Sequence, residues 1–269
     1  MIDFQSKDFY TMGDLVHIVA ILRAPGGCPW DREQTHQSIR PNMLEEAYEV
    51  CEAIDQQDPD HLKEELGDVL LQVALHAQME QEQGVFTFDD VADGICKKLV
   101  FRHPHVFGDV NAQNADQALD AWDAMKRVEK SQTTYTDTLR SVARALPALW
   151  RAEKVQKKAK KAGFDWDDAQ GAVDKLSEEI DELKAAMANG SQADVTEELG
   201  DLLFACVNVA RVVKADPEQA LTQATDKFTD RFALVEEKAR AAGKDMRNMT
   251  LTELDQLWEE AKRDLKDDR

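Results

Sequence analysis

The chain has 269 residues, of which 53 are Asp or Glu and 33 are Lys or Arg, so its formal net charge is −20. That balance argues against a surface for duplex nucleic acid, which needs clustered basic side chains. Glycine (12) and proline (7) are sparse, as is typical of a mostly helical protein. No run of alternating apolar and polar residues is long enough to predict a sheet.

The amino-terminal stretch MIDFQSKDFY lacks the basic and then apolar pattern of a signal peptide. The best apolar run, LLFACVNVA at 202–210, is too short to span a bilayer. The four cysteines show no CxxC spacing, so we expect reduced thiols. We therefore expect a soluble cytoplasmic protein whose partners include neither a membrane nor a nucleic acid.

The first predicted structure in chain order is a helical hairpin. Apolar residues recur at helical spacing over 44–54 and over 62–73, and QQDPD at 56–60 interrupts the period. The two helices carry four carboxylates, Glu46, Glu49, Glu65 and Asp68.

This acidic pattern occurs twice in the chain. LEEAYEV at 44–50 and SEEIDEL at 177–183 share Glu-Glu-x-x-Glu, while 64–73 and 197–206 share Glu-Glu-Leu-Gly-Asp-x-Leu. The matched acidic positions, such as 45 and 178, are all 133 residues apart. Self-similarity of this kind predicts an internal duplication.

The duplication predicts the domain organisation. The polar stretch EKSQTTYTDT at 129–138 is the natural linker between the copies. We expect an all-α protein with two tandem helical-bundle domains, 1–132 and 139–269. In each domain, the acidic hairpin is expected to pack against the helices that bear a Lys and Arg pair.

The second hairpin crowds like charges. Glu178, Glu179 and Glu182 share one helix, where acidic pairs one turn apart cost about 0.2–0.5 kcal/mol each. Gly190 marks the turn, and Glu182 and Glu198 lie equally far from it, so they should face each other across an antiparallel pair. We therefore predict a patch of four carboxylates, Glu179, Glu182, Glu198 and Asp201.

Carboxylates on rigid helices, without His or Cys, are hard oxygen ligands that suit Mg²⁺ or Mn²⁺. In phosphoryl transfer such ions neutralise phosphate oxygens and activate water. The alternative is that acidic runs in so acidic a chain are solvated helix faces. We favour metal, because the acidic positions agree between the hairpins while the segments between them hardly do. The first hairpin then provides a second metal site.

Basic and aromatic side chains accompany the carboxylates. Lys227 and Arg231 are one turn apart and suit phosphate oxygens that a metal leaves unneutralised, although surface solubility is the alternative. Trp258 would either stack on a base or belong to the core. The first copy matches these three positions with Lys98, Arg102 and Trp122.

The two copies differ at one informative position, where Asn42 stands in place of Lys175.

His103 and His105 flank Pro104, and we expect structural or interface roles for them, because two histidines without further ligands make a poor closed metal site.

At these residues the sequence resembles the MazG family of nucleoside triphosphate pyrophosphohydrolases, within the all-α NTP pyrophosphatase group, in its tandem-domain bacterial form. The resemblance rests on EExxE followed by ExxD on paired helices. It extends over the chain through GCPWD at 27–31, RHPHVF at 102–107, ALPAL at 145–149, GFDW at 163–166 and NVAR at 208–211.

The resemblance implies Mg²⁺-dependent hydrolysis of a nucleoside triphosphate between its α and β phosphates, giving the monophosphate and pyrophosphate. It also implies a homodimer in which the second domain catalyses and the first mainly serves assembly. Magnesium would be held by Glu179, Glu182, Glu198 and Asp201. The triphosphate would be bound by Lys175, Lys227 and Arg231. Beside the resemblance, we count Glu197 and Trp258 as further candidate substrate-binding residues.

A carboxylate outside the metal set would position the attacking water, and Glu178 and Glu197 both remain open for that role. With these two, the metal ligand Glu179 is a predicted catalytic residue. Broad base specificity is the expectation, because the metal ligands and the basic side chains bind the triphosphate, which all nucleotides share.

The rival hypothesis is a non-catalytic acidic adaptor or scaffold that a metal ion merely stabilises. It explains the charge and the repeat, but not the basic residues that accompany the carboxylates.

Overall fold

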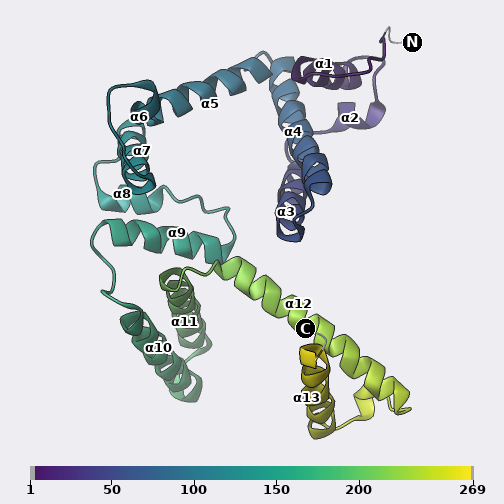
Figure 1. Cartoon of the computed structure of the whole chain (residues 1–269), viewed down its shortest axis with the longest axis vertical. Helices are drawn as coiled ribbons and strands as arrows, with labels where there is room; N and C mark the ends of the chain where they lie inside the picture. The colour runs from purple at the N-terminus through teal and green to yellow at the C-terminus, as the bar shows by residue number, and fades with distance from the viewer. Residues whose placement is uncertain (1–3, 268–269) are drawn as a thin grey trace. The chain divides into compact units, whose positions relative to one another are not determined.

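The computed structural model describes residues 4–267, and the regular elements in that range are all helices (Figure 1). The predicted all-α fold is therefore confirmed. The chain divides into two compact units, an N-terminal unit of residues 1–126 and a C-terminal unit of residues 127–269. The limits 1–132 and 139–269 for separable domains stay predictions. Within the described range, no helix is long and apolar enough to cross a membrane.

The N-terminal unit is built around one antiparallel helix pair (Figure 1). Its helices are α1 (Met12–Arg23), α2 (Pro29–Glu33), α3 (Arg40–Gln56), α4 (Pro59–Glu82), α5 (Phe88–Arg102), α6 (Pro104–Phe107) and α7 (Ala115–Glu129), which runs past the unit boundary. The break between α3 and α4 falls within the predicted QQDPD segment. Gln57 makes the turn in the left-handed conformation (φ 55°).

The core of the N-terminal unit lies where α1 packs on α4. It consists of Val19, Ile39, Ala74, Leu75 and Met79. At the edge of this core, Arg23 of α1 makes two 2.9 Å hydrogen bonds to the carboxylate of Glu82 on α4. These contacts tie the C-terminal end of α4, the second helix of the acidic hairpin, to α1.

The C-terminal unit repeats the antiparallel pair (Figure 1). Its elements are α8 (Tyr135–Arg140), α9 (Ala148–Lys161), α10 (Ala169–Asn189), α11 (Gln192–Val212), α12 (Pro217–Ala241), a 3₁₀ turn (Met246–Asn248) and α13 (Leu251–Asp267). α10 pairs with α11, α12 pairs with α13, and α9 contacts both α11 and α12.

Local sequence explains where these helices begin. Reciprocal caps, in which a Ser or Thr side chain and an Asp three residues later bind each other's backbone amides, start α1, α5, α8 and α11. Proline is the first residue of α2, α4, α6 and α12, where its missing amide hydrogen costs nothing.

The stretch 129–138, which stays the predicted linker, contains the start of α8, and Thr134 and Asp137 cap that helix. α12, which carries Lys227 and Arg231, packs mainly on α13 and α9 and contacts α11 of the acidic hairpin less. In the N-terminal unit, α5 with Lys98 and Arg102 contacts α4 of the other hairpin. Helix patterning predicts an amphipathic face, but it does not identify the helix that covers it.

Candidate active site

The candidate site lies on the hairpin of α10 and α11. Asp168 caps α10 by accepting a hydrogen bond from the Gly171 amide (3.1 Å), and Ser191 and Asp194 cap α11. Gly190 ends α10 between these caps. Gly190 and the Ser191 cap set the turn between the two helices. Residues of α10 and α11 that are equally distant from this turn can therefore meet.

The motifs GFDW and NVAR form a brace for this hairpin. Arg211 of α11 pairs with Asp165 in the loop before α10, and Asn208 accepts a 2.8 Å hydrogen bond from Arg211 Nε. The start of α10 approaches Trp166 closely, because a Cβ added to Gly171 would lie 2.4 Å from Trp166 Cδ1. Both motifs therefore position α10 and α11 rather than supply reacting groups.

Three carboxylates converge between α10 and α11. Glu179, Glu182 and Glu198 each offer an oxygen, and these oxygens lie within 4.8 Å of one another. Glu179 is 5 % exposed, and its Oε2 is buried without a hydrogen-bond partner. An unsatisfied buried group of this kind costs about 1–3 kcal/mol or more. The donor set and the unpartnered oxygen fit a divalent cation with hard oxygen ligands.

The fourth predicted carboxylate, Asp201, is exposed and lies outside this group of three. Its charge still reaches the group: burial raises the pKa of Glu198, and the charges of Glu182, Glu179 and Asp201 raise it further. Carboxylates that share a site oppose each other's ionisation. A bound cation would reverse that effect, so the electrostatics of the group also favour a metal site.

Lys175 belongs to the same cluster. Its Nζ lies 2.7 Å from Glu178 Oε1 and 2.8 Å from Glu179 Oε1. These hydrogen bonds raise the pKa of Lys175 above its usual range, so the ammonium group stays charged at physiological pH. Glu197 is exposed and makes no hydrogen bond or ion pair with any described residue. The Glu178 carboxylate is thus paired with Lys175, whereas the Glu197 carboxylate has no such partner among the described residues.

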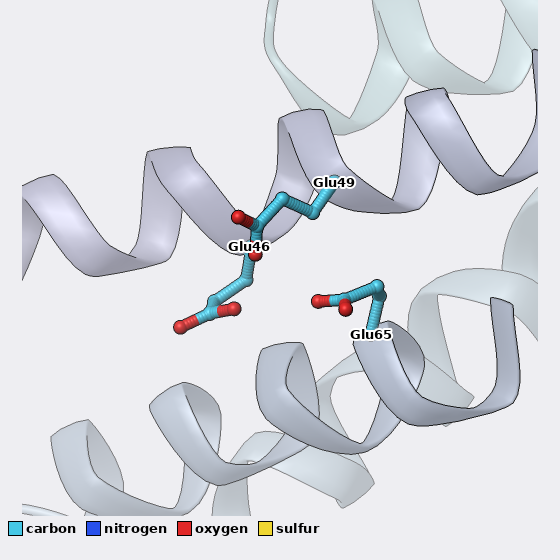
Figure 2. Close-up of side chains that lie close together, drawn as sticks. All are labelled: Glu46, Glu49 and Glu65. Carbon is cyan, nitrogen blue, oxygen red and sulfur yellow. The ribbon is translucent and has the colours of Figure 1, made fainter. Parts of the chain in front are cut away.

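The N-terminal unit repeats the arrangement, and Figure 2 shows Glu46 and Glu49 of α3 beside Glu65 of α4. Oxygens of these three carboxylates also lie within 4.8 Å of one another. Glu65 is 8 % exposed, and its Oε2 is again buried without a partner. Burial is the largest cause that raises the pKa of Glu65 and Glu46. Asp68 lies outside the three, although its charge also raises the pKa of Glu46.

The two clusters differ in the side chain that accompanies them. In the N-terminal unit, His61 Nε2 lies 3.2 Å from Glu65 Oε1, and Asn42 stands where the other unit has Lys175. His61 is not among the site residues predicted from the sequence. Its position one turn before Glu65 on the same helix was the signal that could have identified it.

Basic and aromatic residues form a separate group on α12 and α13. Arg231 Cζ lies 5.8 Å from the centre of the Trp258 ring, and the rings of Phe228 and Trp258 are 5.0 Å apart. Lys227 is exposed, and Arg231 Nε is buried without a hydrogen-bond partner. Within residues 4–267, no hydrogen bond or ion pair joins Lys227 or Arg231 to the carboxylates. The structure therefore presents the predicted site as two groups.

The N-terminal unit has the same basic and aromatic contact. Arg102 Cζ lies 5.2 Å from the centre of the Trp122 ring, and His103 packs edge-on against that ring at 4.6 Å. The Arg–Trp contact in both units extends the duplication from the sequence to the side-chain packing.

The fold and these paired sites define a class: all-helical proteins with two acidic hairpins suited to divalent cations. A family model described as the MazG nucleotide pyrophosphohydrolase domain matches residues 34–107 and 168–235. Both acidic hairpins lie inside these two segments. The chain belongs to the MazG nucleotide pyrophosphohydrolase family and is an enzyme of that class.

Curated relatives extend over the length of the chain. The nucleoside triphosphate pyrophosphohydrolase/pyrophosphatase MazG of Thermotoga maritima is 44 % identical over 249 residues, 93 % of this chain and 94 % of its own. The nucleoside triphosphate pyrophosphohydrolase of Escherichia coli K12 is 46 % identical over 252 residues, 93 % of this chain and 96 % of its own. The uncharacterized protein YabN of Bacillus subtilis is 50 % identical over 246 residues, which are 91 % of this chain and 50 % of YabN.

Proposed function

We propose that this enzyme hydrolyses nucleoside triphosphates between the α and β phosphates in a Mg²⁺-dependent reaction of broad base specificity. The observation that carries the proposal is the convergence of three carboxylates between α10 and α11, one of them with a buried, unpartnered oxygen, in a chain of the MazG family. The Thermotoga and Escherichia relatives are named for this class of activity.

In the proposed site, Glu179, Glu182 and Glu198 hold Mg²⁺, together with Asp201, whose charge reaches Glu198. When bound, the ion neutralises phosphate charge and lowers the pKa of a coordinated water. Mn²⁺ is the alternative ion, because it takes the same oxygen ligands. The N-terminal carboxylates Glu46, Glu49, Glu65 and Asp68 form a second proposed metal site.

The chain's own side chains direct the reaction. A water oxygen bonds to the α phosphorus, the bond from that phosphorus to the bridging α–β oxygen breaks, and pyrophosphate leaves. A carboxylate accepts the proton of the water, and we assign that role to Glu197 rather than Glu178, because the ion pair with Lys175 occupies Glu178. Glu197 is also the carboxylate proposed to contact the substrate.

Substrate binding is assigned to the cations. Lys175, held beside the carboxylates, faces the triphosphate, and Lys227 and Arg231 bind phosphate oxygens that the metal leaves free. Trp258 stacks on the base, because its ring is only half-buried and lies beside Arg231, one of the proposed phosphate-binding cations. The cations contact phosphates and a ring face reads no base edge, so broad specificity follows.

The C-terminal unit is the proposed catalytic unit, because it alone has Lys175. The N-terminal unit, with Asn42 at that position, is proposed to bind metal weakly or to serve assembly. Pyrophosphate release by residues 1–132 and residues 139–269, measured separately with Mg²⁺, tests this assignment. Dominant activity in residues 1–132 would reverse it.

A homodimer is proposed from the exposed apolar side chains of both hairpins. On α10 and α11 these include Val173, Ile180, Leu199, Leu203 and Phe204, and on α3 and α4 they include Leu44, Tyr48 and Leu66. A two-helix pair leaves such a face open, and a second copy would complete a four-helix bundle by two-fold symmetry. Light scattering tests this: a monomer at micromolar concentration would contradict it. The cytoplasm is the proposed location.

The proposed reaction is tested by product analysis. We expect ATP, GTP, CTP, UTP and the deoxynucleotides each to give one monophosphate and one pyrophosphate in the presence of Mg²⁺, and to stay intact in EDTA. Release of orthophosphate and a diphosphate would place the cleaved bond elsewhere and refute the proposal.

A further inference from the structure

A pair of histidines and a glutamate form a cluster in the N-terminal unit, apart from the carboxylates. His36 lies in the turn between α2 and α3, while His76 and Glu80 lie one turn apart on α4. His36 Nδ1 is 2.7 Å from His76 Nδ1, and His36 Nε2 is 2.7 Å from Glu80 Oε1. The two imidazole rings are nearly parallel, at 7°.

The surrounding structure holds these side chains in place. In the turn, the Thr35 amide donates to Ser38 Oγ (2.9 Å) and the Ser38 amide donates to Thr35 Oγ1 (3.2 Å). Ile39, directly after the turn, is 1 % exposed and anchors it in the core. His76 follows the buried Leu75 on α4. The pair is therefore preorganised.

The hydrogen bonds determine which ring nitrogens carry protons. The Glu80 carboxylate accepts, so His36 Nε2 donates and the Nδ1 of a neutral His36 has a free lone pair. That lone pair accepts the proton of His76 Nδ1. The two Nδ1 atoms, 2.7 Å apart, thus share one proton between them.

The geometry points to a binding site for a borderline divalent transition metal, of which Zn²⁺ is the type, with His36 Nδ1 and His76 Nδ1 as its ligands. Imidazole nitrogen suits such ions, whereas Mg²⁺ prefers oxygen. A metal-binding histidine almost always donates its other ring N–H to a carboxylate or a carbonyl, as His36 does to Glu80. This site is chemically distinct from both carboxylate clusters.

The ion replaces the shared proton. Tetrahedral ligation at Zn–N distances of about 2.0–2.1 Å separates two nitrogens by about 3.3 Å, so the pair must open by roughly 0.6 Å. The proton of His76 moves from Nδ1 to Nε2, which leaves both rings neutral and both Nδ1 lone pairs free. Glu80 keeps His36 in the required tautomer throughout.

The remaining coordination positions have room for water or an anion. A groove of about 380 Å³ lies beside the pair and is lined by His36, Gln37, Arg40, Met43, Leu44 and His76. Arg40 is exposed and makes no ion pair with any described residue. Its guanidinium would pair with an anion held on the ion, which offsets the repulsion between the two cations.

Calorimetric titration of the full-length protein with Zn²⁺, in a large excess of Mg²⁺ that saturates the carboxylates, tests the inference. We expect one Zn²⁺ per chain in the wild type and none in His36→Ala or His76→Ala. Glu80→Gln should weaken binding about 10–100-fold, as loss of a partner that orients a ligand does elsewhere. Co²⁺ in place of Zn²⁺ should give a visible absorption band that His76→Ala abolishes.

Control variants separate this site from others. His61→Ala, which alters a histidine beside the carboxylate Glu65, should bind Zn²⁺ as the wild type does. Circular dichroism checks that each variant is folded, and His76→Gln, which keeps an amide donor to His36, replaces His76→Ala if the latter unfolds. Absence of Zn²⁺ binding under excess Mg²⁺, or binding that survives the change of His36 or His76, would overturn the inference.

Discussion

Replacement of Glu179 by Gln tests the proposed metal site most directly. The substitution keeps the shape of the side chain and removes one charge from a position that is 5 % exposed. It also removes one of the three converging carboxylates and the negative charge of the 2.8 Å ion pair with Lys175, which keeps its partner Glu178. An enzyme and a metal-braced scaffold respond differently to this change.

The magnitude follows from linkage. Loss of a residue that merely orients a ligand lowers metal affinity about 10–100-fold, so loss of a ligand should cost at least tenfold. At Mg²⁺ about 100-fold above the wild-type Kd, the ion stabilises the fold by about 2.7 kcal/mol, and a tenfold weaker site gains about 1.4 kcal/mol. The difference of about 1.3 kcal/mol corresponds to a loss of about 3–5 °C in the Mg²⁺-induced rise of Tm.

Turnover should fall at least about 100-fold, because removing one group that stabilises transition-state charge costs about 10²–10³ in kcat. Without metal, Tm should stay unchanged or rise, because crowding of like charges is relieved. Pyrophosphate release and thermal unfolding, each with Mg²⁺ and with EDTA, measure these effects. Asp181→Asn, on an exposed side chain of the same helix, is the matched control. Turnover within tenfold of the wild type, or a fall of Tm in EDTA, would refute the reasoning.

Three further predictions follow from contacts in the two units. Lys175→Asn, which installs the residue found in the N-terminal copy, should lower kcat/KM for ATP about 10–100-fold without unfolding the protein, because a charged hydrogen bond to phosphate is lost; unchanged kinetics would remove Lys175 from the site. The raised pKa of Glu198 means that the folded state holds this proton more tightly than the unfolded state, so its contribution to stability is complete below pH 4.5 and is lost as the pH rises through the raised value. In EDTA, Glu198→Gln should therefore gain stability relative to the wild type as the pH rises above 4.5, as measured by urea midpoints; a difference independent of pH would contradict the raised pKa. Gly171→Ala should destabilise the C-terminal unit by about 1–3 kcal/mol, because its Cβ would lie 2.4 Å from Trp166 Cδ1. Gly94→Ala in α5, whose Cβ meets nothing within 4 Å, should instead be neutral or stabilising; equal effects of the two changes on the urea midpoint would show that the contact with Trp166 is unimportant.

Much of the fold was predictable because its signals are local. The break at QQDPD, the helical spacing of apolar residues and the offset between the acidic motifs all depend on neighbours along the chain. The start of α8 inside the predicted linker was harder to foresee, because a polar stretch and a capped short helix use the same residues, as Thr134 and Asp137 show. The helices that pack on α12 were also not predictable, since the apolar face of a helix does not specify which other helix packs against it.

For the site, the sequence by itself determined which carboxylates can meet, because residues equally far from the turn of an antiparallel hairpin lie at the same height. Only the tertiary structure decided that Glu179, Glu182 and Glu198 converge while Asp201 lies outside them, that Oε2 of Glu179 is buried without a partner, and that Lys175 holds Glu178. It alone brought His36 to His76, which lie 40 residues apart in the chain. These features depend on side-chain rotamers and on contacts between distant segments. The spacing of residues along a helix determines neither of them.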